Sequence, residues 1–262
     1  GGLKDDEFKS VIQTSDGNYA LTGYTKSYND SLGDGWIMRI DQTGNTTFTL
    51  TVGGSFADVF NNLIELPNTN LYFVGSNKSY KNGSNTVNWR YVLSNSNVGI
   101  LDDFIGNTNT ERYNGSVVGL NGTIVSVGYN NYQGAVSDAN IHVFSSALGY
   151  ISYNPFGVEN TDELFVVSKT KDKGFVSVGT CFGNTSLLND ILFVKTDSLG
   201  YYGSSIIGIK ENEWSNINVK IYPNPTTDYF NIDLLTLKNY KNLNLRLIDL
   251  KGTLLKAENI DK

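Results

Sequence analysis

Apolar and polar residues alternate along short runs of this chain, and glycine, asparagine and aspartate separate the runs. In the first part of the chain the alternation predicts four strands, at 8–13, 19–24, 36–41 and 47–52. The first two strands are joined by Ser15-Asp16-Gly17-Asn18, which suits a tight hairpin turn. Helical spacing of the apolar residues is absent. The pattern predicts antiparallel β-structure.

The same pattern recurs about every 52 residues, which predicts repeats at about 1–52, 53–104, 105–155 and 156–207. One marker of each repeat is a glycine after the apolar run of the second strand: Gly23, Gly75, Gly128 and Gly179. A second marker is the indole that begins the third strand of the first two repeats, Trp36 and Trp89. We expect these six residues to be structural positions of the blades, with both indoles packed in the core.

Four antiparallel strands in about 50 residues, repeated along the chain, are typical of a β-propeller, whose blades bury their faces against one another. The predicted fold class is therefore all-β, with four propeller blades over residues 1–207. Because most propellers close with more than four blades, we interpret the four as part of a larger ring. Residue 1 is then the cut end of a longer protein. A complete four-bladed ring is the alternative.

Three motifs are clearest in the early repeats: Gly53-Gly54-Ser55, the run from Thr14 to Thr25, and the run from Asp34 to Gly44. Together they resemble the β-propeller repeats that are common in secreted bacterial proteins. The second repeat departs from the pattern, since Asn88-Trp89 keeps the aromatic residue but the aspartate is lost. The resemblance covers about residues 1–207 and implies an architecture rather than a ligand or a reaction.

After residue 207 the repeat pattern stops. Residues 208–218 are short and charged, and we interpret them as a linker. Residues 219–228 hold two of the four prolines of the chain, which predicts an extended segment that cannot join a central strand ladder. Alternation then predicts strands at 229–234, 243–248 and 253–257, the start of a small β-sandwich.

The segment Tyr222-Pro223-Asn224-Pro225, with the later Leu245-x-Leu247-x-Asp249-x-x-Gly252 hairpin, resembles the type A C-terminal sorting domain of the Bacteroidetes type IX secretion system. The resemblance covers residues 219–262 and implies a destination, outside the cell or on its surface. It also implies a partner, the secretion machinery, with these four residues as the sorting motif. The chain stops after about half of the expected sandwich, so we interpret the domain as truncated.

Charge and composition exclude several classes of partner. Lys and Arg number 20 against 26 Asp and Glu, for a net charge of −6, and no basic cluster is present that would favour nucleic acid. No apolar run is long enough for a transmembrane segment. The single cysteine cannot form an intramolecular disulfide or a cysteine-built zinc site.

Few residues suggest chemistry. We expect His142, the single histidine, to be a surface or half-buried strand residue in register with Arg90 of the preceding repeat. Cys181 is interpreted as a small packed thiol. The recurring acids Asp6, Asp58 and Asp162 suit loop ties better than calcium ligands, which need several oxygens at close spacing. The polar loop 29–34 is the best local cluster of oxygen ligands, and solvation explains it better than ion binding. No catalytic, cofactor or metal residue is predicted.

Two functions compete. The first is a non-catalytic binding or adhesion module, secreted or held on the cell surface, whose loops contact an unknown glycan or protein ligand. The second is an accessory propeller of a larger secreted hydrolase whose catalytic domain lies upstream. Fold alone does not separate them, because propellers host many activities.

Overall fold

The computed structural model describes residues 1–28, 32–106, 110–131, 137–157, 161–182, 189–202, 219–222, 231–234, 243–248 and 254–260. These residues are mainly β-strands, with two single-turn 3₁₀ helices, η1 (Ser79–Lys81) and η2 (Leu120–Gly122). The chain divides into two compact units, Gly1–Ile209 and Lys210–Lys262. The all-β fold class is confirmed.

The first unit consists of antiparallel sheets in which consecutive strands are neighbours, as local hairpins dictate. We call the sheets blades 1 to 4. Blade 1 contains β1 (Asp6–Gln13), β2 (Tyr19–Thr25), β3 (Asp34–Ile40) and β4 (Thr46–Val52). Blade 2 contains β5 (Asp58–Glu65), β6 (Leu71–Asn77), β7 (Val87–Leu93) and β8 (Gly99–Ile105). Blade 3 contains β9 (Glu111–Val118), β10 (Ile124–Asn130), β11 (Asp138–Phe144) and β12 (Tyr150–Phe156). Blade 4 contains β13 (Asp162–Lys169), β14 (Phe175–Phe182) and β15 (Asn189–Thr196), and the place of a fourth strand falls largely outside the described residues.

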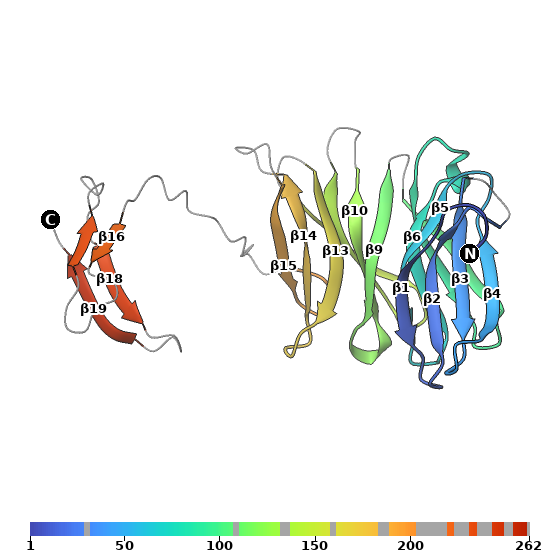
Figure 1. The fold of residues 1–262 in the computed structure, drawn as a ribbon, viewed down its shortest axis with the longest axis horizontal. Helices are drawn as coiled ribbons and strands as arrows, with labels where there is room; N and C mark the ends of the chain where they lie inside the picture. The colour runs from blue at the N-terminus through green and yellow to red at the C-terminus, as the bar shows by residue number, and fades with distance from the viewer. Residues whose placement is uncertain are drawn as a thin grey trace. The chain divides into compact units, whose positions relative to one another are not determined.

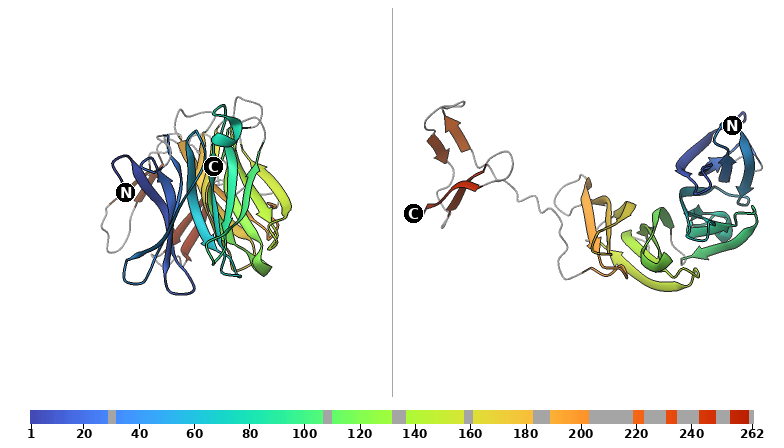
Figure 2. Two further views of the ribbon diagram at one scale, coloured as in Figure 1. Left: turned by 90° about the vertical axis from the view of Figure 1, so that its right-hand side faces the viewer. Right: turned by 90° about the horizontal axis from the view of Figure 1, so that it is seen from below.

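The blades follow one another around an arc, with the first strand of each blade on the inner side (Figures 1 and 2). β1 contacts β5, β5 contacts β9, and β9 contacts β13. Each of β5, β9 and β13 also packs on the second and third strands of the blade before it. The arc stays open between blade 4 and blade 1 (Figure 2). The arrangement is that of propeller blades, without a closed ring.

The core lies between blades because the strands alternate their side chains between two faces. Ile37 of blade 1 packs with Phe60 and Trp89 of blade 2, and all three are buried. The next two interfaces repeat this layer, with Tyr72 facing blade 3 and Ile141 facing blade 4. Each blade therefore depends on its neighbours to cover its apolar faces.

The hairpin turns explain why glycine is frequent but not required at one turn position. The fourth residue of every hairpin turn in these blades has a positive φ, the left-handed conformation that glycine adopts most readily. Gly17, Gly44, Gly122 and Gly200 take this place in four turns. Thr69, Asn97, Leu148 and Lys173 take it in others. In the turn that begins at Asp41, Gly44 N–H donates to the Asp41 carbonyl at 3.1 Å, the hydrogen bond of a β-turn.

The second unit contains two antiparallel hairpins, β16 (Val219–Tyr222) with β17 (Asn231–Leu234), and β18 (Leu243–Ile248) with β19 (Leu254–Ile260). β16 is a strand that the sequence analysis did not predict within residues 219–228, and its two-stranded sheet is compatible with the expectation that this segment stays out of a central ladder. β16 ends at Tyr222, so each of its residues precedes Pro223 and retains its backbone N–H. The interpreted linker, 208–218, lies outside the described residues. Within the described ranges, no helix is long and apolar enough to span a membrane.

Candidate functional site

The four repeat glycines lie at one position, opposite the innermost strand of each blade. Each pairs with a residue beside a β-bulge: Phe8, Phe60, Tyr113 and Leu164. A Cβ atom added at Gly128 would lie 1.8 Å from the carbonyl oxygen of Arg112. At each of the other three glycines, an added Cβ would lie 1.8 to 1.9 Å from a backbone carbonyl oxygen of the first strand. Each second strand continues beyond its glycine, as the predicted strand at 19–24 does beyond Gly23. Only glycine lets the bulged strand approach this closely.

The two tryptophans also lie at one position, and they differ in what covers them. Trp89 is buried against blade 1 and stacks on Phe60 with ring centroids 3.9 Å apart. Trp36 is buried too, and it stacks on Phe8 at 4.3 Å. Because Gly35 and Ile37 face blade 2, Trp36 points to the opposite face, where no described blade covers it.

The two ends of the blades differ in their connections. At one end every hairpin turn has five residues, as at 14–18. At the other end the second and third strands are joined by longer connections whose lengths differ: 26–33, 78–86, 131–137 and 183–188. The first two begin with the same tripeptide, Lys-Ser-Tyr, and differ after it. This is the upper end in Figure 1, where η1 lies. The upper end therefore varies between repeats, as binding surfaces on rigid scaffolds do.

Acids at the upper end hold the loops in place. One carboxylate oxygen of Asp58 accepts hydrogen bonds from the backbone N–H groups of Lys78 and Ser79. The other oxygen accepts hydrogen bonds from the backbone N–H of Gly54 and from the Ser79 hydroxyl. Asp6 accepts the equivalent hydrogen bonds from Gly2 N–H and from the N–H and hydroxyl of Ser27. Its fourth donor is the Thr25 hydroxyl, which is the largest cause that lowers the pKa of its carboxyl. These two carboxylates are loop ties, since backbone and hydroxyl donors occupy their oxygens.

The backbone N–H groups of the recurring acids also donate hydrogen bonds between neighbouring blades. The backbone N–H of Asp58 donates to the Gly33 carbonyl at 2.8 Å, and that of Asp162 donates to the Ser137 carbonyl at 2.6 Å. Nowhere in the described ranges do three or more His, Cys, Asp or Glu side chains gather into a group that could hold a metal ion. Of the polar loop 29–34, residues 29–31 lie outside those ranges, and Asp34 is buried.

The most polar part of the core lies between blades 2 and 3. Arg90 is buried there, forms an ion pair with Asp103 and places its guanidinium 4.0 Å from the centroid of the Phe144 ring. Tyr72 shares a 3.2 Å hydrogen bond with Ser126, and burial raises the pKa of Tyr72 to about 12. Burial keeps the tyrosine protonated, and the ion pair with Asp103 compensates the buried charge of Arg90.

His142 belongs to the same cluster and is buried, not at the surface or half-buried as the sequence suggested. Its register partner is Ser126, two residues before the repeat glycine, which makes Tyr91 of blade 2 its equivalent rather than Arg90. A slip of one residue along a strand exchanges the two faces of a sheet, so the expected position was on the wrong side. Burial, and then the charge of Arg90, lowers the pKa of His142 to about 3.

We expect His142 to make the stability of the blades depend on pH. The folded protein keeps the imidazole neutral above about pH 3, whereas the unfolded chain binds a proton below about 6.5. Unfolding then takes up a proton, so the free energy of unfolding should fall from pH 6.5 to 4.5 by at most about 1.4 kcal/mol per pH unit. Urea unfolding across this range measures the slope.

The matched variant is His142→Phe, which fits the aromatic surroundings of Phe144 and Tyr153 and removes the only histidine. It should unfold with almost no pH dependence in that range. Hydrogen bonds lower the pKa values of Asp41 and Asp172 to about 2. These two carboxylates therefore reduce the free energy of unfolding only below about pH 4. An equal slope in wild type and variant would contradict the assignment.

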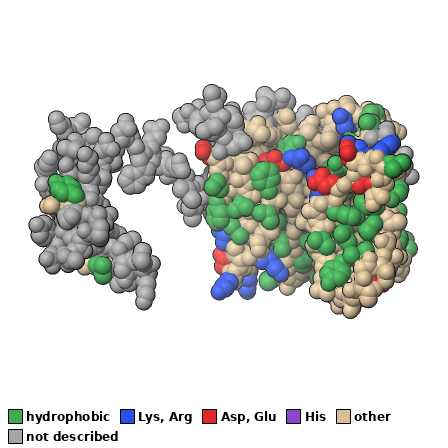
Figure 3. All heavy atoms as spheres, viewed as in Figure 1, with side chains coloured by type: hydrophobic (Ala, Val, Ile, Leu, Met, Phe, Trp, Pro, Cys, Tyr) green, Lys and Arg blue, Asp and Glu red, His purple; other side chains and the backbone are tan. Residues whose placement is uncertain are grey.

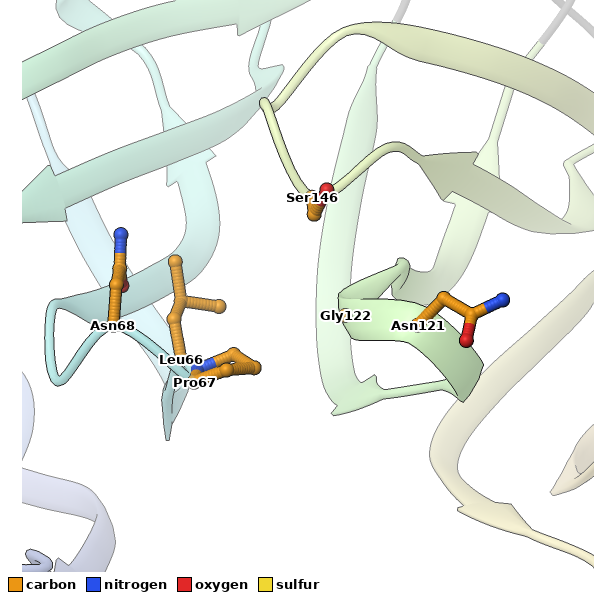
Figure 4. A pocket seen from close by; sticks show the side chains of 6 residues that line it. All are labelled: Leu66, Pro67, Asn68, Asn121, Gly122 and Ser146. Atoms are coloured by element: carbon orange, nitrogen blue, oxygen red, sulfur yellow. The ribbon is translucent and has the colours of Figure 1, made fainter.

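One shallow pocket lies at the end with the short turns (Figure 4). Leu66, Pro67 and Asn68 come from one turn of blade 2, while Asn121, Gly122 and Ser146 come from two turns of blade 3. Its volume of about 180 Å³ is below the roughly 300 Å³ at which small-molecule sites begin. None of the side chains that line it is charged, so the pocket suits water molecules better than a ligand.

Cys181 lies half-buried in β14, and burial is the largest cause that raises the pKa of its thiol. A raised thiol pKa leaves little thiolate at neutral pH, so this cysteine is a weak nucleophile. Of the sorting motif, the structure describes only Tyr222, which is exposed at the end of β16. Pro223, Asn224 and Pro225 lie outside the described residues.

Comparison with known proteins adds one family. Residues 220–262 match the secretion system C-terminal sorting domain. The chain has no match among the curated proteins. Proteins that carry this domain are exported by the type IX secretion system and are secreted or attached to the cell surface. The tail therefore implies an interaction with that machinery and places the protein outside the cell.

Proposed function

We propose that this chain is a binding or adhesion module, without catalytic activity of its own, that contacts a glycan or protein outside the cell. The observation that carries the proposal is the difference between the two ends of the blades. Uniform five-residue turns close one end, while longer connections that differ between repeats gather at the other. Variable loops on a rigid sheet scaffold are where binding residues concentrate.

Tyr80 is a contact point that this end offers. Its side chain is 54% exposed in η1, and one ring face is stacked on Phe104 with centroids 4.4 Å apart. The Lys81 ammonium lies 5.1 Å from the centroid of the Tyr80 ring. A rigid, exposed aromatic ring next to a positive charge suits a sugar face or an acidic peptide, because little side-chain freedom is lost on contact.

The experiment is binding of the purified chain to a printed array of glycans and extracellular proteins. We expect retention on at least one class of spot, and loss of about tenfold in affinity for Tyr80→Ser, since stacked aromatic anchors dominate interfaces. Tyr150→Ser is the matched control, because Tyr150 is 59% exposed beside a short turn at the opposite end. Equal weakening by both changes, or cleavage of a retained glycan or protein, would refute the proposal.

A further inference from the structure

Each interface between blades contains one layer at the level of the repeat glycine. The layer consists of the two residues that pair with this glycine and of one residue from the third strand of the preceding blade. Between blades 1 and 2 the layer is a glycine and two stacked aromatic rings: Gly35, Phe60 and Trp89. Between blades 3 and 4 it is aliphatic: Ala139, Leu164 and Leu192. Between blades 2 and 3 it is a phenol and two amides: Asn88, Tyr113 and Asn140.

The polar side chains of blade 3 point toward blade 2. Tyr113 packs in one cluster with Tyr72 of blade 2. Asn140 pairs with Gly128, as Tyr113 does, and residues paired across adjacent strands lie on the same face of a sheet. His142 lies two residues further along β11 and therefore on that face too. Its ring stands edge-on to the Tyr113 ring, with centroids 5.4 Å apart.

These groups are buried, and several of their polar atoms lack a partner. Asn88 donates to Glu111 of blade 3 at 3.0 Å, so its amide also lies in the interface. Asn88, Tyr113 and Asn140 are 0% exposed and His142 is 4% exposed. On the face drawn in Figure 3, no histidine side chain is visible at the surface. In the described part of the chain, five atoms of these side chains reach no hydrogen-bond partner: Asn88 Oδ1, Tyr113 Oη, Asn140 Oδ1 and Nδ2, and His142 Nδ1.

The residue at position 140 explains why this layer has polar atoms to satisfy. In blade 2 the equivalent Trp89 fills the layer with its indole and donates its N–H to Asp102 at 2.7 Å. An amide is much smaller than an indole, and Asn88 in place of Gly35 restores only part of the lost volume. Polar space inside a protein is occupied by water, whereas apolar space stays dry.

We propose that blades 2 and 3 enclose a binding site for ordered water, which bridges Asn88, Tyr113, Asn140 and His142. The unpartnered atoms include acceptors, such as Asn88 Oδ1, and donors, such as Tyr113 Oη and Asn140 Nδ2. Water donates and accepts, so it satisfies both kinds. A metal cation would leave the donors unpaired, and an anion would leave the amide oxygens unpaired. Because a buried water makes about three hydrogen bonds, about two molecules serve the site.

Unfolding of the whole chain in urea tests the site through Tyr113→Phe, which removes one hydroxyl and keeps the ring. If the hydroxyl binds water, its loss leaves that water short of a partner, so we expect the folding equilibrium constant to fall about fivefold. Tyr80→Phe is the control, because Tyr80 is 54% exposed, and it should leave the constant unchanged. A buried hydroxyl without any partner is unfavourable, so a constant that rises in Tyr113→Phe would overturn the proposal.

Magnetic relaxation dispersion of the water signal counts the water molecules that exchange slowly with solvent. The double variant Asn88→Gly with Asn140→Trp rebuilds the layer found between blades 1 and 2. We expect it to hold about two fewer slowly exchanging waters than the wild type. An equal count in both proteins would place the waters elsewhere and refute the site. If the double variant does not fold, a crystal structure of the wild type decides, and direct hydrogen bonds among these side chains with no water between them would refute the site equally.

Discussion

Removal of residues 219–262 is expected to leave the protein in the periplasm of a host that has a type IX secretion system. The matched sorting domain occupies residues 220–262 of this segment. Tyr222 is exposed at the end of β16 and is followed at once by two prolines around one asparagine. Such a segment has little backbone freedom in solution, so it loses little entropy when it docks on a partner.

The measurement compares the whole chain with the shortened chain, both behind the same periplasmic signal peptide. Surface labelling and protease treatment of intact cells should detect only the whole chain. Substitution of Pro223 and Pro225 by alanine tests the stiffness argument, and Ile100→Glu, an exposed position in the first unit, is the control. Equal export of the shortened chain would show that the tail is dispensable for delivery.

Gly128→Ala is expected to unfold blades 2 to 4, with a loss of roughly 4 kcal/mol or more in the free energy of unfolding. A Cβ there would lie 1.8 Å from the Arg112 carbonyl oxygen and 3.0 Å from the Tyr113 Cα. Both contacts are backbone, so no side chain can move aside. Separating the strands by an ångström would break the bulge pairing and open the core on which Tyr113 packs.

Urea and thermal unfolding, followed by near-ultraviolet circular dichroism, measure this loss. Gly149→Ala is the matched control in the same blade, because its added Cβ meets only the Ser145 hydroxyl, at 3.3 Å, in an exposed turn. It should change the free energy of unfolding by less than about 1 kcal/mol. If the two variants unfold alike, close backbone approach is not the reason for glycine at position 128.

Local patterns in the sequence located most elements of the blades. The predicted strand at 19–24 is Tyr19–Thr25 in the structure, and the predicted strand at 243–248 is Leu243–Ile248. Alternation and turn residues act over a few neighbours, so their effect can be read without the fold. The strand Val219–Tyr222 was missed because the prolines that follow it concealed a short paired segment.

The sequence predicted the candidate functional residues of the sorting tail but not those of the blades. Residues 222–225 are a contiguous motif, so they could be recognised as sequence. Tyr80 carries no such signal, since its exposure and its stacking on Phe104 depend on how the β6–β7 connection folds back over β8. The strand ends alone indicate that this connection is long.

The sequence by itself determined the repeat, the strand order within each blade and the sorting tail, because period, turn chemistry and contiguous motifs are local properties. Only the tertiary structure decided which face of a strand is covered. It placed His142 in the core and pointed Trp36 away from blade 2, and it exposed Val11 and Ile191 at positions that are buried elsewhere. Burial depends on whether a neighbouring blade is present, and a strand that alternates has the same sequence pattern with or without that neighbour.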